Sequence, residues 1–276
     1  HKEYRRQRQM CIRDRYNKIT GEDLATAVGI KKQAISQFEN GKASPEYGTV
    51  CKISNVLRFP VQFFYEDDIP VLQGNTYFRA LFTSNKRELN SQKIKTKYVA
   101  QIYATLTRYV DFRAYNVPVF EDTTDISKIA SQLRDYWGLG QEPIPDMVSL
   151  LERNGVVMSE FATDSSKIDA FSQYDEIKGV PYHCIVLGTE KGSFVRRQFS
   201  CAHELGHIIL HEKYEDLSEI SREDFRRRED EANTFAAEFL LPREAFLADL
   251  QRHANKLNRY IAVSYTHLTL PTILLV

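Results

Sequence analysis

Two histidines stand four residues apart in SCAHELGHIILHEK, residues 200–213, and this spacing constrains the fold more than any other feature of the chain. On an α-helix, residues i and i+4 lie on the same face, so His203 and His207 can direct both imidazoles at one point. The flanking side chains are mostly small or apolar, which indicates a buried helix whose polar groups need partners. A shared metal ion would be such a partner; the alternative is an amphipathic helix with an exposed histidine face.

The residue after the first histidine, Glu204, completes an HExxH pattern. Zn²⁺ binds neutral imidazole, and a catalytic zinc site has three protein ligands and one position for water. Glu204 is placed to accept a proton from that water. His211 would lie about 12 Å along the helix axis from His203, too far to share the ion. We expect His211 to be a cation at the helix end or a group that contacts a ligand, so the third ligand must come from another helix.

Candidates for this third ligand occur in REDEANTFAAEFLLP, residues 228–242. If this segment is a helix, its apolar residues form a stripe along one face. At about 100° per residue, Glu229 lies roughly 50° from the centre of this stripe, whereas Glu231 and Glu238 lie more than about 100° from it. Glu229 is therefore expected to point inward, and the other two are expected to be solvated. Asn233 follows Glu229 by one turn and is expected to form a hydrogen bond with a metal ligand.

The segments RQFSCAHELGHIILH and EDEANTFAAEFLLP, with WGLGQEPI and LLERNGV before them, resemble the ImmA/IrrE family of zinc metallopeptidases over roughly residues 126–250. The resemblance implies that Zn²⁺ is held by His203, His207 and Glu229 and that Glu204 is the general base. The implied reaction is gluzincin-type peptide hydrolysis, in which zinc activates water and polarises the scissile carbonyl. The base then passes the proton to the leaving amine.

The stretch PYHCIVLG, residues 181–188, has the composition of a strand. We expect it at the edge of a small sheet near the cleft, where an extended substrate could pair with its backbone. Tyr174, Tyr182 and His183 are candidates for stabilising an oxyanion, but each fits a core or surface position equally well.

A second motif lies in LATAVGIKKQAISQFENGKASP, residues 24–45. Thr20 and Asp23 are expected to form a capping box for a helix that ends at Gly29, and another helix follows directly with Ile35 turned inward. Two short helices joined by a tight turn are the arrangement that inserts a recognition helix into the DNA major groove. The motif resembles the Cro/phage-repressor helix-turn-helix of XRE regulators.

This second resemblance assigns DNA contacts to polar side chains on and around the second helix. The base-facing positions are Lys32, Gln33, Ser36 and Gln37, and the backbone-facing positions are Lys31, Asn40 and Lys42. Glutamine can pair with adenine, and lysine can reach guanine or phosphate. The segment is only mildly basic, so we expect salt-sensitive binding of a double-stranded operator by a homodimer on paired half-sites. The alternative is a helical bundle with a solvated basic face.

The composition of the whole chain restricts its partners. The 37 basic and 37 acidic side chains balance, so any contact with DNA must come from a local patch. Four scattered cysteines without a CxxC pair argue against a disulfide framework and a cysteine zinc site. No run approaches the roughly 18 apolar residues of a membrane span, and no secretion signal is evident. We therefore expect a cytoplasmic protein without a membrane partner.

The sequence predicts a mostly α, α+β protein in which an all-helical domain precedes a zincin-like α+β domain with a small sheet. Both ends resemble translated sequencing-adapter DNA and are expected to be non-native. The expected segments are a non-native start (1–15), the helix-turn-helix domain (16–67), a helical connector with a long helix over 88–112 (68–124), a C-terminally truncated metallopeptidase domain (125–262) and a non-native tail (263–276).

These patterns together predict a transcriptional regulator whose zinc endopeptidase cleaves either a repressor or other regulatory protein or its own chain in trans. The sequence does not choose between these substrates. The alternative is a DNA-binding repressor or antitoxin-like protein whose metallopeptidase fold binds zinc without cleaving. A general degradative protease is less favoured, because such enzymes rarely need a recognition helix.

Overall fold

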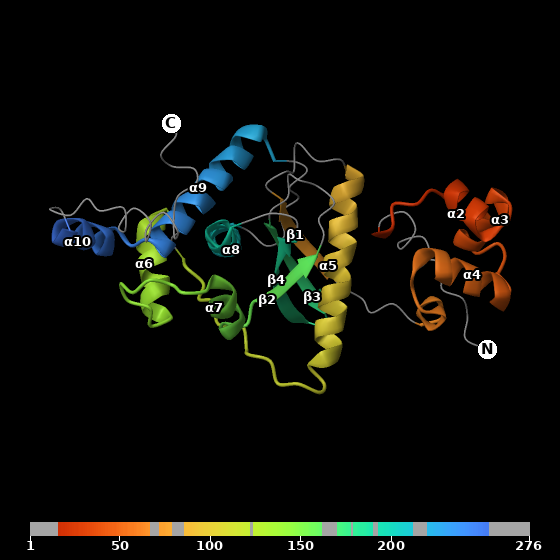
Figure 1. The fold of residues 1–276 in the computed structure, drawn as a ribbon, viewed down its shortest axis with the longest axis horizontal. Coiled ribbons are helices and arrows are strands. Elements are labelled where there is room, and N and C mark those ends of the chain that lie inside the picture. The colour runs from red at the N-terminus through yellow and green to blue at the C-terminus, as the bar shows by residue number, and fades with distance from the viewer. Residues whose placement is uncertain are drawn as a thin grey trace. The chain divides into compact units, whose positions relative to one another are not determined.

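The computed structural model describes residues 16–66, 72–78, 86–121, 124–161, 170–177, 179–189, 193–211 and 220–253. The chain divides into two compact units, residues 1–71 with 83–102 and residues 72–82 with 103–276 (Figure 1). The described part of the first unit is helical, and the second combines helices with a four-stranded sheet. The predicted mostly α, α+β fold class is confirmed. The adapter-like ends lie outside the described residues.

Among the described residues of the first unit, three short helices and a 3-10 helix surround one apolar core. They are α2 (Gly21–Val28), α3 (Lys32–Glu39), α4 (Tyr47–Leu57) and η2 (Val61–Phe64). The core is formed by Leu24, Ala25, Val28, Ile35, Val50, Ile53, Leu57 and Phe64. Because these side chains come from all four helices, burial of the shared core holds α2 and α3 at a fixed angle.

The turn between α2 and α3 forms as the sequence predicts. The Thr20 hydroxyl accepts a hydrogen bond from the Asp23 amide at 3.1 Å, and the Asp23 carboxylate accepts from the Thr20 amide at 3.2 Å. Gly29 ends α2 with a φ of 77°, a left-handed conformation that is strained for residues with a Cβ. The capping box and the stop are therefore confirmed, and α3 begins three residues later at Lys32.

The next helix, α5, spans Lys86–Leu106 and ends before the position expected from the sequence. In the first unit, the Tyr98 ring of α5 lies 5.7 Å from that of Phe63 and 6.0 Å from those of Tyr16 and Phe59. Aromatic pairs at these separations pack favourably. This ring cluster joins α5 to the helix-turn-helix core.

The sheet of the second unit has the strand order β1-β3-β4-β2. Its strands are β1 (Leu72–Phe78), β2 (Val157–Phe161), β3 (Ala170–Ile177) and β4 (Val180–Gly188). The β1–β3 and β3–β4 pairs are antiparallel, and β2 runs parallel to β4. The prediction that residues 181–188 form an edge strand is wrong, because β4 pairs with β3 on one side and with β2 on the other. The sheet also gains β1 next to β3, from residues whose sequence reads as irregular.

Five helices complete the described part of this unit. They are α6 (Ile126–Tyr136), α7 (Met147–Arg153), α8 (Phe194–Leu210), α9 (Arg222–Leu240) and α10 (Arg243–His253). Helix α8 packs on β3 and β4 with one face and on α9 with another, so it lies between the sheet and α9 (Figure 1). Among the described residues, no helix combines the length and apolar character needed to cross a membrane.

A buried arginine links α6 to the end of α9. The guanidinium of Arg134 donates hydrogen bonds to the carbonyl oxygens of Gly140 at 2.8 Å, Phe239 at 2.6 Å and Glu142. All three acceptors are backbone carbonyls, and that of Phe239 is buried, so it needs a donor within the protein. Arg134 therefore fixes the direction in which α9 leaves the core.

Replacement of Arg134 by methionine should destabilise the protein strongly. Methionine fills a similar volume but leaves three carbonyl groups without their donor, which should cost about 3 kcal/mol or more of unfolding free energy. Chemical denaturation of the full chain measures this loss. Lys128→Met, an exposed position on the same helix, is the matched control and should change the unfolding free energy by less than about 0.5 kcal/mol. Equal stability of the two variants would contradict this role.

Candidate metal centre

The helix that carries the HExxH motif is buried along its second half. Ser193 caps the start of α8 by accepting a hydrogen bond from the Arg196 amide. Further along, His203, Glu204 and His207 are only 4%, 2% and 1% exposed. The alternative of an exposed histidine face is therefore wrong.

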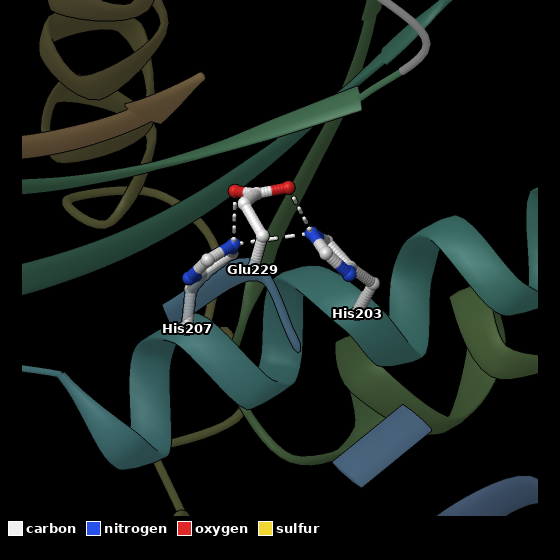
Figure 2. A group of neighbouring side chains, drawn as sticks. All are labelled: His203, His207 and Glu229. Atoms are coloured by element: carbon white, nitrogen blue, oxygen red, sulfur yellow. Dashed lines mark hydrogen bonds and ion pairs between the residues drawn. The ribbon is translucent and has the colours of Figure 1, made fainter. Parts of the chain in front are cut away.

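Three side chains from two helices converge at one point (Figure 2). His203 and His207 come from α8, and Glu229 reaches them from α9 with its side chain 13% exposed. The two Nε2 atoms lie 3.1 Å apart, and the Glu229 oxygens lie 3.6 Å from Nε2 of His203 and 3.3 Å from Nε2 of His207. One ligand atom of each residue falls within 4.8 Å of the other two. This spacing suits ligands around a single ion.

The close approach of α8 and α9 brings Glu229 within reach. A Cβ on Gly206 would lie 3.2 Å from both Ala232 Cα and Phe235 Cδ1, closer than ordinary contacts allow. The absence of a side chain at this position lets the two helix backbones approach. Buried Ala202, Leu205 and Phe235 fill the surrounding core.

The Nδ1 atoms of both histidines also have partners. His203 Nδ1 lies 3.0 Å from Asn233 Oδ1, an acceptor, so this nitrogen carries the proton. His207 Nδ1 lies 2.9 Å from His211 Nδ1, and His211 Nε2 lies 3.1 Å from Glu231 Oε2. The carboxylate requires the neutral His211 ring to donate from Nε2, so its Nδ1 accepts from His207 Nδ1–H. This network directs the unprotonated Nε2 of both His203 and His207 toward Glu229.

This arrangement fits a metal ion better than it fits the side chains alone. Two Nε2 lone pairs and a carboxylate converge, and these groups repel one another unless a cation lies among them. A set of two imidazoles and one carboxylate is a known catalytic zinc ligand set. His203, His207 and Glu229 would hold the ion, so the residues present suit zinc.

Burial favours the neutral imidazoles that metal binding requires. It lowers the pKa of His207 well below 6.5, and the positive charge of His211, when protonated, and of Arg228 lowers it further. Burial also lowers the pKa of His211, although its hydrogen bond to Glu231 opposes this shift. Both rings are therefore neutral at pH 7, and no proton competes with a metal for Nε2 of His207.

The remaining acidic candidates lie in different surroundings. Glu204 is buried beside His203 but does not belong to the cluster of ligand atoms. The expectation that Glu231 is solvated is wrong, because it pairs with His211 and its side chain is only 29% exposed. Glu231 lies outside the apolar stripe of α9, but His211 at the end of α8 provides a partner on this face. Glu238 is half-buried.

The oxyanion candidates lie on both faces of the sheet. Tyr174 and His183 pair across β3 and β4, with ring centroids 4.9 Å apart, and Tyr115 stacks on His183 at 4.4 Å. Tyr182 precedes His183 on the strand, so it points to the opposite face, where it contacts Tyr103. Tyr182 therefore lies away from α8, and Tyr115 is a neighbour that the sequence did not indicate.

The predicted DNA-contacting side chains are all exposed in the first unit. They are Lys31, Lys32, Gln33, Ser36, Gln37, Asn40 and Lys42. Three of them have side-chain partners within this unit: Lys32 Nζ lies 3.1 Å from Glu22 Oε2, and Asn40 Nδ2 donates to the Ser36 carbonyl at 2.8 Å and to the Ser36 hydroxyl at 3.2 Å. An exposed ion pair contributes little, so Lys32 can exchange Glu22 for a nucleic-acid partner at small cost.

The full chain should bind one zinc ion through the convergent ligands. His207→Ala and Glu229→Ala each remove a ligand and should leave less than stoichiometric zinc after dialysis, as measured by elemental analysis. Glu238→Ala, a half-buried carboxylate further along α9, should retain one zinc per chain. Full zinc occupancy in both ligand variants would contradict the site.

Two family models match the chain. Residues 13–64 match a model described as helix-turn-helix, and this range contains α2 and α3. Residues 151–268 match a peptidase family model described as the IrrE N-terminal-like domain, which includes α8 and α9. No curated protein and no solved structure matches the chain. Residues 13–64 therefore form an XRE-type helix-turn-helix domain, and residues 151–268 match the IrrE N-terminal-like domain of a peptidase family.

Proposed function

We propose that this protein is a cytoplasmic DNA-binding regulator whose second domain is a zinc-dependent endopeptidase that cleaves a regulatory protein. The convergence of His203, His207 and Glu229 next to Glu204 carries this proposal. The two family matches support the combination of a DNA-binding domain with a peptidase domain.

The ligand residues bind and orient the metal in this proposal. His203 and His207 would coordinate through Nε2, and Glu229 would coordinate through its carboxylate. Hydrogen bonds at both Nδ1 atoms prevent the rings from rotating and keep their lone pairs directed inward. When bound, zinc supplies Lewis-acid polarisation of the scissile carbonyl and of the attacking water.

Glu204 moves the proton. Its carboxylate accepts a proton from the attacking water and delivers it to the nitrogen of the leaving amine. Two features of Glu204 support this role: it follows a ligand histidine on α8, and it is not itself one of the converging ligands. Its burial excludes bulk water, which strengthens electrostatic interactions with the reacting groups.

The first domain is proposed to bind a double-stranded DNA operator through α3. Its seven exposed polar candidates, which include Gln33 and Gln37, suit direct contacts with base edges and phosphates. A single domain with so small a positive charge would bind weakly, so we propose a homodimer on paired half-sites. Proteolysis of a repressor or another regulator would then be linked to occupancy of the operator.

Cells that produce the wild type should contain a cleaved protein that cells producing Glu204→Gln lack. The substitution removes the proton acceptor but keeps the size of the side chain, so cleavage should fall by about 100- to 10,000-fold. Proteome-wide analysis of new protein termini measures this difference, and zinc content verifies that the variant retains its metal. Identical termini in both strains, with operator binding retained, would instead support a non-cleaving repressor.

Gln33→Ala should weaken binding to the preferred operator. Loss of a bidentate contact with adenine costs about 1–3 kcal/mol, whereas binding to random DNA should change little. A preferred sequence can be selected from random duplexes with the wild type and then used in fluorescence anisotropy. Gln62→Ala, an exposed glutamine outside the proposed contact set, is the control. If both variants bind the selected site as tightly as the wild type, Gln33 does not read a base.

A further inference from the structure

We propose that His211 and Glu231 are positioning residues for the metal centre, which together hold the His207 ring with Nδ1 as a donor and Nε2 directed at the metal. This inference rests on the metal-binding part of the proposed function. It adds a further polar connection between α8 and α9, because Glu231 of α9 contacts His211, which lies on the Nδ1 side of the His207 ring.

The position of His211 at the end of α8 makes this contact possible. His211 is the C-cap residue, and its extended backbone, with φ −118° and ψ 152°, leaves the helix there. Its amide still donates to the His207 carbonyl at 3.3 Å, which keeps the two residues adjacent. The two ring centroids lie 5.0 Å apart, and the His211 side chain is almost fully buried. The imidazole is therefore enclosed between His207 and α9.

Glu231 is itself held in place on α9. Its Oε2 atom contacts His211 Nε2 at 3.1 Å, and its Oε1 atom accepts from Arg227 at 3.3 Å. Arg227 also donates to Asp224, one turn earlier, at 3.2 Å. These contacts direct one carboxylate oxygen toward solvent-exposed Arg227 and the other toward His211.

The two Nε2 ligands are thus oriented by different groups. An amide oxygen, that of Asn233, contacts Nδ1 of His203 directly. For His207, a second imidazole lies between the ring and its carboxylate. In this series His207 donates from Nδ1 to Nδ1 of His211, and His211 donates from Nε2 to Glu231. Loss of either His211 or Glu231 therefore removes the preference for the His207 tautomer that can coordinate metal.

Zinc affinity tests this role without reference to peptidase activity. In competition with a chromophoric chelator, His211→Ala and Glu231→Leu should weaken zinc binding by the full chain about 10- to 100-fold. Glu231→Gln keeps an acceptor oxygen for His211 and should retain most of the affinity. Glu238→Leu, the same change at a half-buried position two turns further along α9, is the matched control and should bind like the wild type. Wild-type affinity in both His211→Ala and Glu231→Leu would overturn the proposal.

The tautomers provide a second readout, which a purely structural role would not produce. In ¹⁵N-edited NMR spectra of the zinc-loaded wild type, His207 should carry its proton on Nδ1 and His211 should carry its proton on Nε2. A His211 ring protonated on Nδ1 would overturn the proposal, because that ring could not accept from His207. This measurement needs no substitution, so misfolding of a variant cannot obscure it.

Failure of this proposal can be told apart from failure of the proposed function. If the zinc affinities of His211→Ala and Glu231→Leu both equal that of the wild type while cleavage still depends on Glu204, only the positioning role is lost. If cleavage is absent but Glu231→Leu binds zinc more weakly than Glu238→Leu, the positioning role stands and the peptidase function fails.

Discussion

The close contact between α8 and α9 at Gly206 is the constraint on which the candidate metal centre depends. The carboxylate of Glu229 can meet two imidazoles on α8 only because the Ala232 backbone lies near enough that a Cβ on Gly206 would lie 3.2 Å from it. Buried Leu205 and Phe235 stabilise this contact by removing apolar surface from water. The packing of Gly206 between α8 and α9 thus determines where Glu229, one turn before Ala232, lies relative to the two histidines.

The same crossing arranges hydrogen bonds around the ligands. Helix α9 contributes Asn233 to one histidine and Glu231, through His211, to the other. The third ligand, Glu229, and two of the groups that orient the histidines, Glu231 and Asn233, therefore all lie on one helix, α9. We infer that the centre is preorganised, which limits the entropy lost when a metal or substrate binds.

The sequence predicts where individual helices begin and end better than it predicts contacts between segments that lie far apart in the chain. The capping residues of α2 and the glycine that ends it follow from local rules, because each depends on residues within a few positions. The interior place of β4 does not, because strand order depends on pairing between distant segments. In the same way, the helical periodicity of α9 predicts that Glu229 points inward. It cannot predict the contact between Glu231 and His211, because His211 lies at the end of α8.

X-ray absorption at the zinc K-edge, measured on the full chain loaded with one equivalent of zinc, tests the central claim most directly. Coordination by His203, His207 and Glu229 predicts two imidazole nitrogens and at least one carboxylate oxygen, all at about 2.0–2.2 Å from the metal, without sulfur. A spectrum with sulfur ligands at about 2.3 Å, or with oxygen neighbours and no imidazole, would contradict the proposed ligands.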